Sequence, residues 1–199
     1  MKHIKKFETV AAFEAVQATL DKPNVSYVTE IGGVNYLPYI PPVIETKLIV
    51  KYNVTDTEED TPLYFGDYLD HIDALEIDGI EQNEVISSYR FDTTGEHVVK
   101  FTLPVSDVIY SWTFAYTNSI TEIIIPSIVT QLSGAAFGYC SNLSSITCNA
   151  MTAPTLFDDK GSYPFTNIAA NGTLYVPTGS TGYDTWLAQL GNGWTKVEQ

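Results

Sequence analysis

Carboxylates, histidines and two cysteines are the residues of this chain best suited to chemistry. The carboxylates crowd one stretch, where calcium binding or hydrolysis by paired acids is the chemistry to consider. The spacing is not that of an EF-hand loop, and no glycine stands at its turn position. We therefore expect solvated acid, with a calcium site and, more remotely, glycoside hydrolysis as alternatives. The crowded residues are Asp67, Asp70, Asp73, Glu76 and Asp78.

The histidines and cysteines do not have the spacing that metal binding or nucleophilic catalysis requires. His3, His71 and His97 are scattered, away from each other and from any cysteine. A cysteine nucleophile needs a nearby histidine, and the segment around Cys140 and Cys148 has none. Two cysteines make no disulfide framework, so we expect free thiols, with Cys148 in the core and Cys140 in a turn. Free thiols fit a reducing cytosol.

Composition and charge favour a β-rich protein without a nucleic-acid or membrane partner. The 199 residues include 13 Tyr and 9 Phe, which favour strands. The net charge of −14 repels phosphate backbones. No apolar run approaches the ~18 residues of a membrane span. Glu8 and Glu14 interrupt the apolar start, so we expect no signal peptide. With no nucleotide-binding or hydrolase motif, we expect a non-enzymatic protein without cofactors.

Residues 1–42 predict a small α+β module. Apolar residues at helical spacing predict a helix, and Val25–Glu30 and Val34–Tyr39 predict a hairpin around a Gly-Gly pair. A proline-rich exit follows. The helix stripe and the basic start predict an assembly anchor, which consists of Lys2, Lys5, Lys6, Val10, Phe13, Val16 and Leu20.

Residues 43–106 predict a compact β domain. Apolar and polar residues alternate over residues 47–54 and 98–103, which is typical of strands with one buried face. Turn residues separate these runs. We interpret the segment as a β-sandwich and considered an immunoglobulin-like one, for which it is short.

Residues 107–177 contain an internal repeat. Phe114, Phe137 and Phe165 each precede an apolar-x-apolar triplet by nine residues, at offsets of 23 and then 28 residues. A single such strand cannot bury its own face, so we expect stacked parallel strands with the phenylalanines in the core. The domain at residues 107–199 would then be a short solenoid, closed by a capping helix at residues 181–190. The predicted strands are Glu122–Ile125, Ser145–Cys148 and Thr173–Val176.

Alternate residues of these strands should face outward and form a candidate interaction surface. Ile124 and Tyr175 are apolar at positions where solvent is expected. Either a contact patch or the ordinary scatter of apolar groups over a protein surface accounts for them. The surface consists of Glu122, Ile124, Ser145, Thr147, Thr173 and Tyr175.

Residues 111–150 resemble the BspA-like leucine-rich repeats, whose units read roughly AF-x-x-C-x-x-L-x-x-I-x-I-P. The first unit departs from this pattern with Thr117 for the cysteine, and the second ends in Asn149 where a proline is usual. The segment from residue 174 to 197 also looks like the usual close of such arrays. The resemblance implies a solenoid for structure or recognition, without an active site. The residues that fit are Ala136, Phe137, Cys140, Leu143, Ile146 and Cys148.

The opening is similar to a leader on virion proteins of tailed phages of gut Bacteroidales, which carry a KKFET start and a PNVSY hairpin. Here these are residues 5–9 and Pro23–Tyr27. The resemblance implies a capsid auxiliary, head-fibre or tail protein that is assembled in the host cytoplasm with other virion proteins or copies of itself. The alternative is a bacterial BspA-like surface adhesin for a host protein or glycan, and an unrecognised enzyme ranks last.

Overall fold

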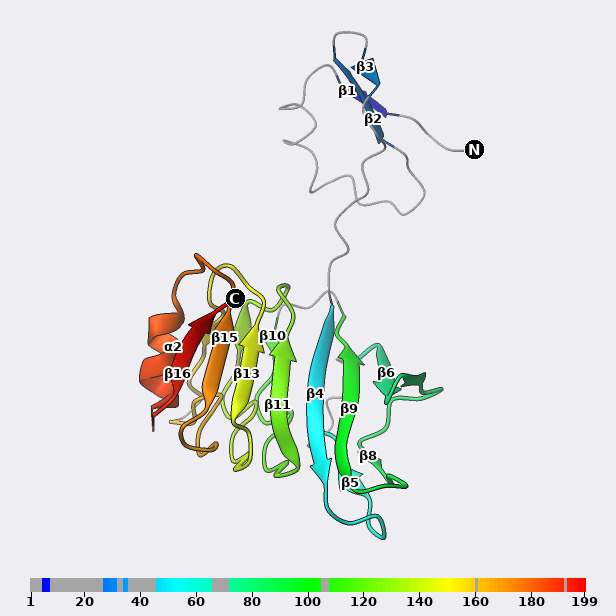
Figure 1. Ribbon diagram of the computed structural model, residues 1–199, viewed down its shortest axis with the longest axis vertical. Coiled ribbons are helices and arrows are strands. Elements are labelled where there is room, and N and C mark those ends of the chain that lie inside the picture. The colour runs from blue at the N-terminus through cyan, green and yellow to red at the C-terminus, as the bar shows by residue number, and fades with distance from the viewer. Residues whose placement is uncertain are drawn as a thin grey trace. The chain divides into compact units, whose positions relative to one another are not determined.

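The computed structural model describes residues 5–7, 27–31, 34–35, 46–65, 72–104, 108–159, 161–191 and 193–199. Contacts divide the chain into two compact units, Met1–Val43 and Ile44–Gln199. Most described residues belong to the second unit, which is mainly β-structure with one helix (Figure 1).

The first unit contains a three-stranded sheet in the order β1-β2-β3, formed by β1 (Lys5–Phe7), β2 (Tyr27–Ile31) and β3 (Val34–Asn35). The antiparallel pair β2–β3 confirms the predicted hairpin. The parallel pairing of β1 with β2 was not predicted. Lys5 and Lys6 of the predicted anchor lie in β1. The remaining anchor residues and the predicted helix lie outside the described residues.

The second unit is built on one eight-stranded sheet in the order β16-β15-β13-β11-β4-β9-β6-β7. The strands β11, β13, β15 and β16 are parallel, which confirms the predicted stack and adds one strand to it. Figure 1 shows these strands side by side, next to the longer β4 and β9. The strands are β4 (Lys47–Val54), β6 (Ala74–Ile77), β7 (Ile80–Glu81), β9 (Gly95–Thr102), β11 (Ile120–Ile125), β13 (Ser145–Cys148), β15 (Thr173–Val176) and β16 (Thr195–Glu198).

The predicted β-sandwich, immunoglobulin-like or otherwise, is not confirmed. The strand β4 pairs antiparallel with β11, so the alternating strands of residues 43–106 extend the repeat sheet. Their buried side chains share a core with the repeat strands. Alternation shows that a strand has one buried face but not which layer covers it. The domain boundary at residue 106 stays a prediction, and one sheet crosses that position.

Each coil of the solenoid also contributes a second short strand, and these second strands together form a separate sheet. These strands are β10 (Val108–Ile109), β12 (Gln131–Leu132) and β14 (Thr155–Leu156), and they pair in parallel. A further pair, β5 (Thr61–Pro62) with β8 (Ser88–Tyr89), lies in the β4–β9 region.

A third row of backbone hydrogen bonds joins the turns between these strands. The Phe114 N–H donates to the Ala136 carbonyl over 2.7 Å, and one coil later the Phe137 N–H donates to the Pro164 carbonyl over 2.9 Å. The row repeats although the second coil is longer. The five extra residues therefore lie outside the hydrogen-bonded turn and leave the stacking intact.

The turns hold non-glycine residues in the left-handed region at one position of every coil. Tyr116, Tyr139 and Asn167 have φ values of 62°, 64° and 56°. This conformation is uncommon for residues other than glycine, asparagine and aspartate. Its recurrence shows that the stacked coils, rather than local preference, determine the turn.

The recurring spacing of the phenylalanines corresponds to an aromatic stack in the core. The Phe114 and Phe137 rings lie 4.9 Å apart at an interplanar angle of 3°, and the Phe137 and Phe165 rings lie 5.8 Å apart at 12°. Phe137 is fully buried. This confirms that the phenylalanines fill the core.

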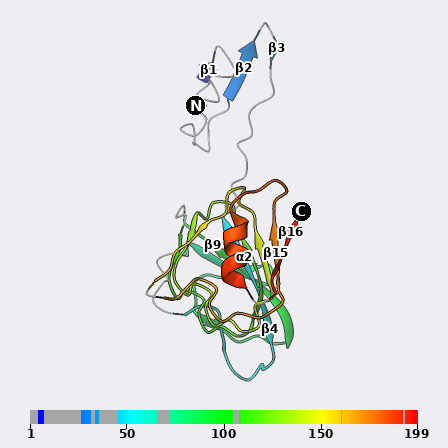
Figure 2. The ribbon, with the colours of Figure 1, turned by 90° about the vertical axis from the view of Figure 1, so that its left-hand side faces the viewer.

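The helix α2 (Tyr183–Leu190) caps the last coil and confirms the predicted capping helix. Figure 2 shows it in front of the coils. Trp186 is buried against Phe165, and its indole N–H donates to the Pro154 carbonyl over 2.8 Å. The Tyr183 hydroxyl donates to the Ala150 carbonyl over 2.7 Å. These bonds satisfy the polar atoms of two large buried side chains.

Candidate interaction surface

The outward side chains of β11, β13 and β15 form two straight rows. Each row contains three of the six residues predicted for the interaction surface, and each of those residues is partly buried. We call these six residues the strand face. One row is Glu122, Ser145 and Thr173, and the other is Ile124, Thr147 and Tyr175.

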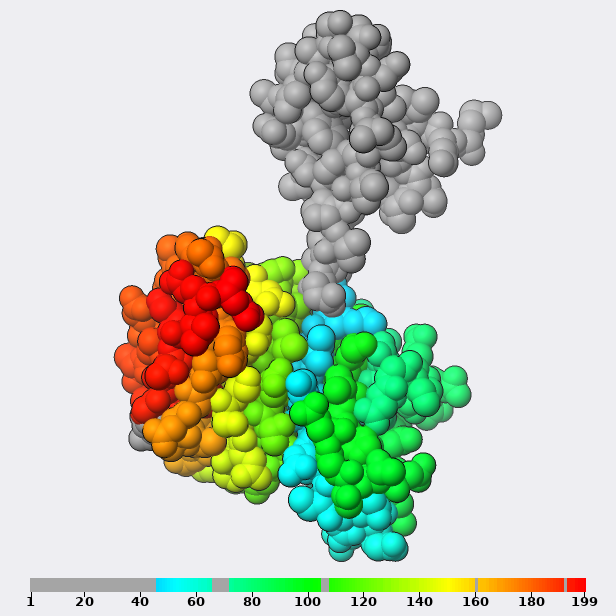
Figure 3. Space-filling model, viewed as in Figure 1, coloured from blue at the N-terminus to red at the C-terminus, as the bar shows by residue number. Residues whose placement is uncertain are grey.

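The apolar row continues onto the neighbouring strands. Ile49 of β4 pairs with Ile124, and Val197 of β16 pairs with Tyr175. Val197 is 41% exposed. The row therefore crosses five adjacent strands, which Figure 3 shows side by side on one face of the sheet. Sequence reasoning did not join Ile49 to this row, and it missed Val197 because β16 was not predicted.

Ion pairs lie beside the apolar row. The Lys51 Nζ lies 3.3 Å from Glu122 Oε2 and 3.6 Å from Glu96 Oε1. Burial lowers the pKa of Lys51, but hydrogen bonds and charge attraction from Glu122 and Glu96 outweigh it and raise that pKa above its ordinary value. One ammonium group thus offsets part of the negative charge of two carboxylates on this side of the sheet.

Glu76 of β6 holds the second group of ion pairs. Its carboxylate oxygens lie 2.5 Å from Lys100 Nζ and 3.1 Å from Lys47 Nζ. The hydrogen bond from Lys100, followed by that from Lys47, lowers the pKa of Glu76 below its ordinary value of 4.5. This pairing joins β6 and β4 to the central strand β9.

We expect the Glu76 pairs to stabilise the fold above the ordinary pKa of a glutamate, and to lose that contribution as the pH falls through the lowered pKa. The two ion pairs exist only in the folded state, where they oppose protonation of Glu76. As the pH falls, the unfolded state therefore gains this proton first. Urea unfolding measured between about pH 6 and pH 3 should show a steeper loss of stability for the natural chain than for the Glu76→Gln variant. If the unfolding free energy of the two chains fell equally with pH, the Glu76 ion pairs would contribute nothing to stability.

The acidic stretch is only partly described, and two of its described members, Glu76 and Asp78, have side-chain partners. Glu76 binds the two lysines. The Asp78 carboxylate accepts a hydrogen bond from the Val98 N–H over 2.8 Å and lies 2.7 Å from His97 Nδ1. Within the described ranges, no group of three or more His, Cys, Asp or Glu residues could hold a metal ion. Asp67, Asp70 and His71 lie outside those ranges.

Both cysteines are buried free thiols. Cys140, which we expected in a turn, lies in the core, and its Sγ donates to the Phe114 carbonyl over 3.0 Å. Burial raises the pKa of Cys140 to about 12 and also raises that of Cys148. A thiol that stays protonated and buried is a packing group and a poor nucleophile.

Comparison with known protein families finds the BspA type leucine rich repeat region, in six copies, over residues 71–178. That range is more than half of the chain. The chain belongs to the BspA-type leucine-rich-repeat family. No curated protein and no solved structure matches it.

The BspA-type repeats begin earlier than we inferred. The match starts at residue 71, whereas we placed the first repeat after residue 106. It therefore includes β6 and β9, which lie in the same sheet as the later coils. Sequence reasoning missed these copies because they lack the phenylalanine-to-triplet spacing of nine residues.

Leucine-rich repeats typically serve as non-enzymatic modules that bind other proteins, and their strand sheets are common contact surfaces. This gives the BspA-type repeats of this chain an interaction or adhesin-like role. In the part of the chain that the structure describes, no helix has the length and apolar character needed to cross a membrane.

Proposed function

We propose that this chain is a non-enzymatic interaction protein that binds a protein partner through the strand face. The observation that carries the proposal is the in-register row across five strands, four of which contribute an apolar residue, with ion pairs beside it. Protein interfaces commonly combine an apolar centre containing aromatic residues with a polar rim. Tyr175 and Ile124 would be central contacts, and Lys51 and Glu122 would lie at the rim.

The alignment favours a contact patch over ordinary scatter. Scattered apolar groups are normal on any surface, but they have no reason to occupy one register row. Here Ile49, Ile124, Tyr175 and Val197 do so, although they come from four strands and two kinds of pairing. A partner that covers this row buries apolar side chains from four strands at once.

In this proposal the chain itself is a component of a phage particle. The support is the resemblance of the opening to virion leaders, together with the pairing of its two motifs. The KKFET segment supplies β1 and the PNVSY segment ends at Tyr27 of β2, where Lys5 pairs with Tyr27. The predicted anchor in residues 1–42 would attach the chain to other virion proteins or to further copies of itself.

Membership of the BspA-type family favours a second candidate function, a surface adhesin that binds a host protein or glycan. Both candidates use the strand face as the contact surface. They differ in what holds the chain, since only the virion proposal requires the first unit to bind inside a particle.

Removing residues 1–43 should separate attachment from recognition. Contacts divide the chain at Val43, so we expect residues 44–199 to fold alone, with the circular dichroism of a β-rich protein. In the virion proposal, full-length chain appears in purified particles by mass spectrometry and the truncated chain does not, while both bind the same soluble partner. Equal incorporation of the truncated chain would contradict the anchor, and absence of the full-length chain from particles would favour the adhesin.

A further inference from the structure

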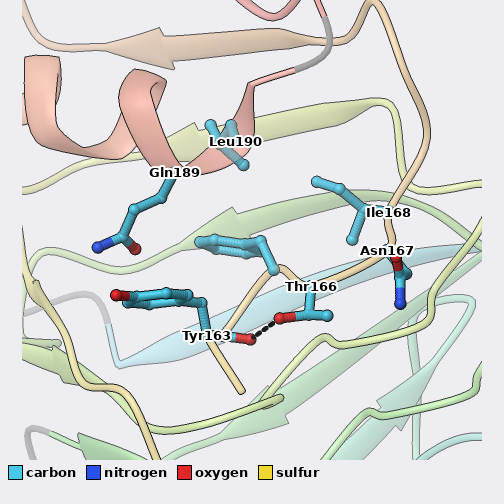
Figure 4. A pocket seen from close by; sticks show the side chains of 7 residues that line it. Tyr163, Thr166, Asn167, Ile168, Gln189 and Leu190 are labelled. Atoms are coloured by element: carbon cyan, nitrogen blue, oxygen red, sulfur yellow. Dashed lines mark hydrogen bonds between the residues drawn. The ribbon is translucent and has the colours of Figure 1, made fainter. Parts of the chain in front are cut away.

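A pocket of about 210 Å³ lies where α2 meets the third coil of the solenoid. We call it the α2 pocket. Tyr163, Thr166 and Asn167 come from the turn of the coil, and Gln189 and Leu190 come from the helix. Figure 4 shows Gln189 next to Tyr163 on one side, Ile168 on the other, and Leu190 between them. The volume is below the ≈300–1,000 Å³ typical of pockets for drug-sized molecules, so it suits one small group.

The pocket exists because the exposed aromatic ladder of the turns stops there. Tyr116 and Tyr139 stack 4.5 Å apart at 5° on successive coils. The third coil has Asn167 at the same left-handed position. Its shorter side chain lines the pocket together with Tyr163, which is 43% exposed. The pocket therefore combines an aromatic ring with an amide at its wall.

The polar groups of the pocket are available to a ligand. Among the described residues, the Tyr163 hydroxyl and the Asn167 and Gln189 amides have no hydrogen-bond partner. The Thr166 hydroxyl donates to the Tyr163 carbonyl over 2.9 Å and keeps its oxygen free to accept. Each amide offers both donors and an acceptor. A purely apolar ligand would leave these groups unpaired, which costs binding free energy.

The pocket is also uncharged within a strongly acidic chain. Every described residue that lines it has a neutral side chain, although the sequence has 24 acidic residues. A cationic ligand would find no carboxylate there, and the overall negative field disfavours an anionic one. The ligand that matches is neutral, has several hydroxyls, and presents a C–H face that can pack on an aromatic ring.

We infer that the α2 pocket binds one unit of a neutral saccharide. The Tyr163 ring contacts the C–H face of the sugar, and the Asn167 and Gln189 amides hydrogen-bond its hydroxyls. The site shares no residue with the strand face, so the chain has two independent binding surfaces. The sugar is either free or the terminal unit of a glycan, and the recognition chemistry is the same for both.

Saturation-transfer NMR on the full chain tests this inference with the methyl glycosides of glucose, galactose, mannose and N-acetylglucosamine. A site of this size should bind at least one of them with a Kd on the order of 1–10 mM. The double variant Tyr163→Ala/Gln189→Ala should weaken that binding by about tenfold or more, whereas Phe157→Ala, at an exposed residue outside both surfaces, should leave it unchanged. A trisaccharide ending in the same sugar identifies the source. Tighter binding of the trisaccharide than of the methyl glycoside indicates a glycan, and equal binding of the two indicates the free sugar.

Two results would overturn the inference. One is that none of the four glycosides binds at concentrations of about 50 mM. The other is that the double variant, shown to be folded by an unchanged urea midpoint, binds as the natural chain does. Neither result affects the strand face, whose binding is measured with a protein partner.

Discussion

The Phe137→Ala variant is expected to lose about 3–5 kcal/mol of stability, the usual cost of removing a buried phenylalanine from a packed core. Phe137 is fully buried and stacks on Phe114 on one side and Phe165 on the other. Its removal leaves a cavity between two coils that depend on each other for their buried faces. In a short repeat array, such a loss should unfold the neighbouring coils as well. Urea unfolding, followed by fluorescence and circular dichroism, measures it.

Phe157→Ala is the matched control for this variant. Phe157 is 51% exposed, directly after β14. The same chemical change there should alter stability by less than about 0.5 kcal/mol. If the two variants had equal urea midpoints and slopes, the aromatic stack would not contribute to the stability of the solenoid, and the assigned packing would be wrong.

The Ile124→Lys variant is expected to abolish partner binding while the chain stays folded. Ile124 is partly buried within the apolar row, between Ile49 and Thr147. A new ammonium group there remains hydrated in the free protein but must be desolvated in a complex. That penalty is several kcal/mol, so the Kd should rise by at least about 100-fold. Binding of the partner to immobilised chain measures the change.

Two comparisons make this result specific. The Met151→Lys variant places the same charge on an exposed side chain outside the strand face, and it should bind the partner normally. Far-UV circular dichroism should be the same for all three chains. Unchanged binding by Ile124→Lys would show that the partner contacts another surface.

The repeat was predictable because stacking imposes the same requirement on every coil. Phe114, Phe137 and Phe165 must reach one stack, and their triplets must share one register, so the spacing is visible in the sequence. The capping helix was predictable for a similar reason. Its apolar stripe, which includes Trp186 and Leu190, covers the open end of the last coil.

The pairing of β4 with β11 was not predictable from the same patterns. Ile49 and Ile124 are distant in sequence, and antiparallel pairing at that separation leaves no local mark. Period-two alternation is identical in a sandwich and in an extension of the repeat sheet. The short strand β16 has alternating burial too weak to detect, since Lys196 is its only partly buried residue.

The two candidate sites also differ in how far the sequence predicts them. The six residues of the strand face followed from alternation within predicted strands. Their continuation through Ile49 and Val197 required the register between strands. The α2 pocket could not be predicted, because it combines the turn of the third coil with the end of α2, and its residues carry no catalytic or metal-binding pattern.

The most direct test of the central claim is site-specific photocrosslinking from the strand face in the organism or particle that contains the protein. Two variants of the full-length protein are compared. A benzophenone amino acid replaces Tyr175 in the first variant and Phe157 in the second. We predict that the Tyr175 probe yields one defined crosslinked protein, identified by mass spectrometry, that the Phe157 probe does not yield, and that Ile124→Lys removes this product. If the two probes gave the same products, or the Tyr175 probe gave none, the strand face would not be the binding surface of this protein.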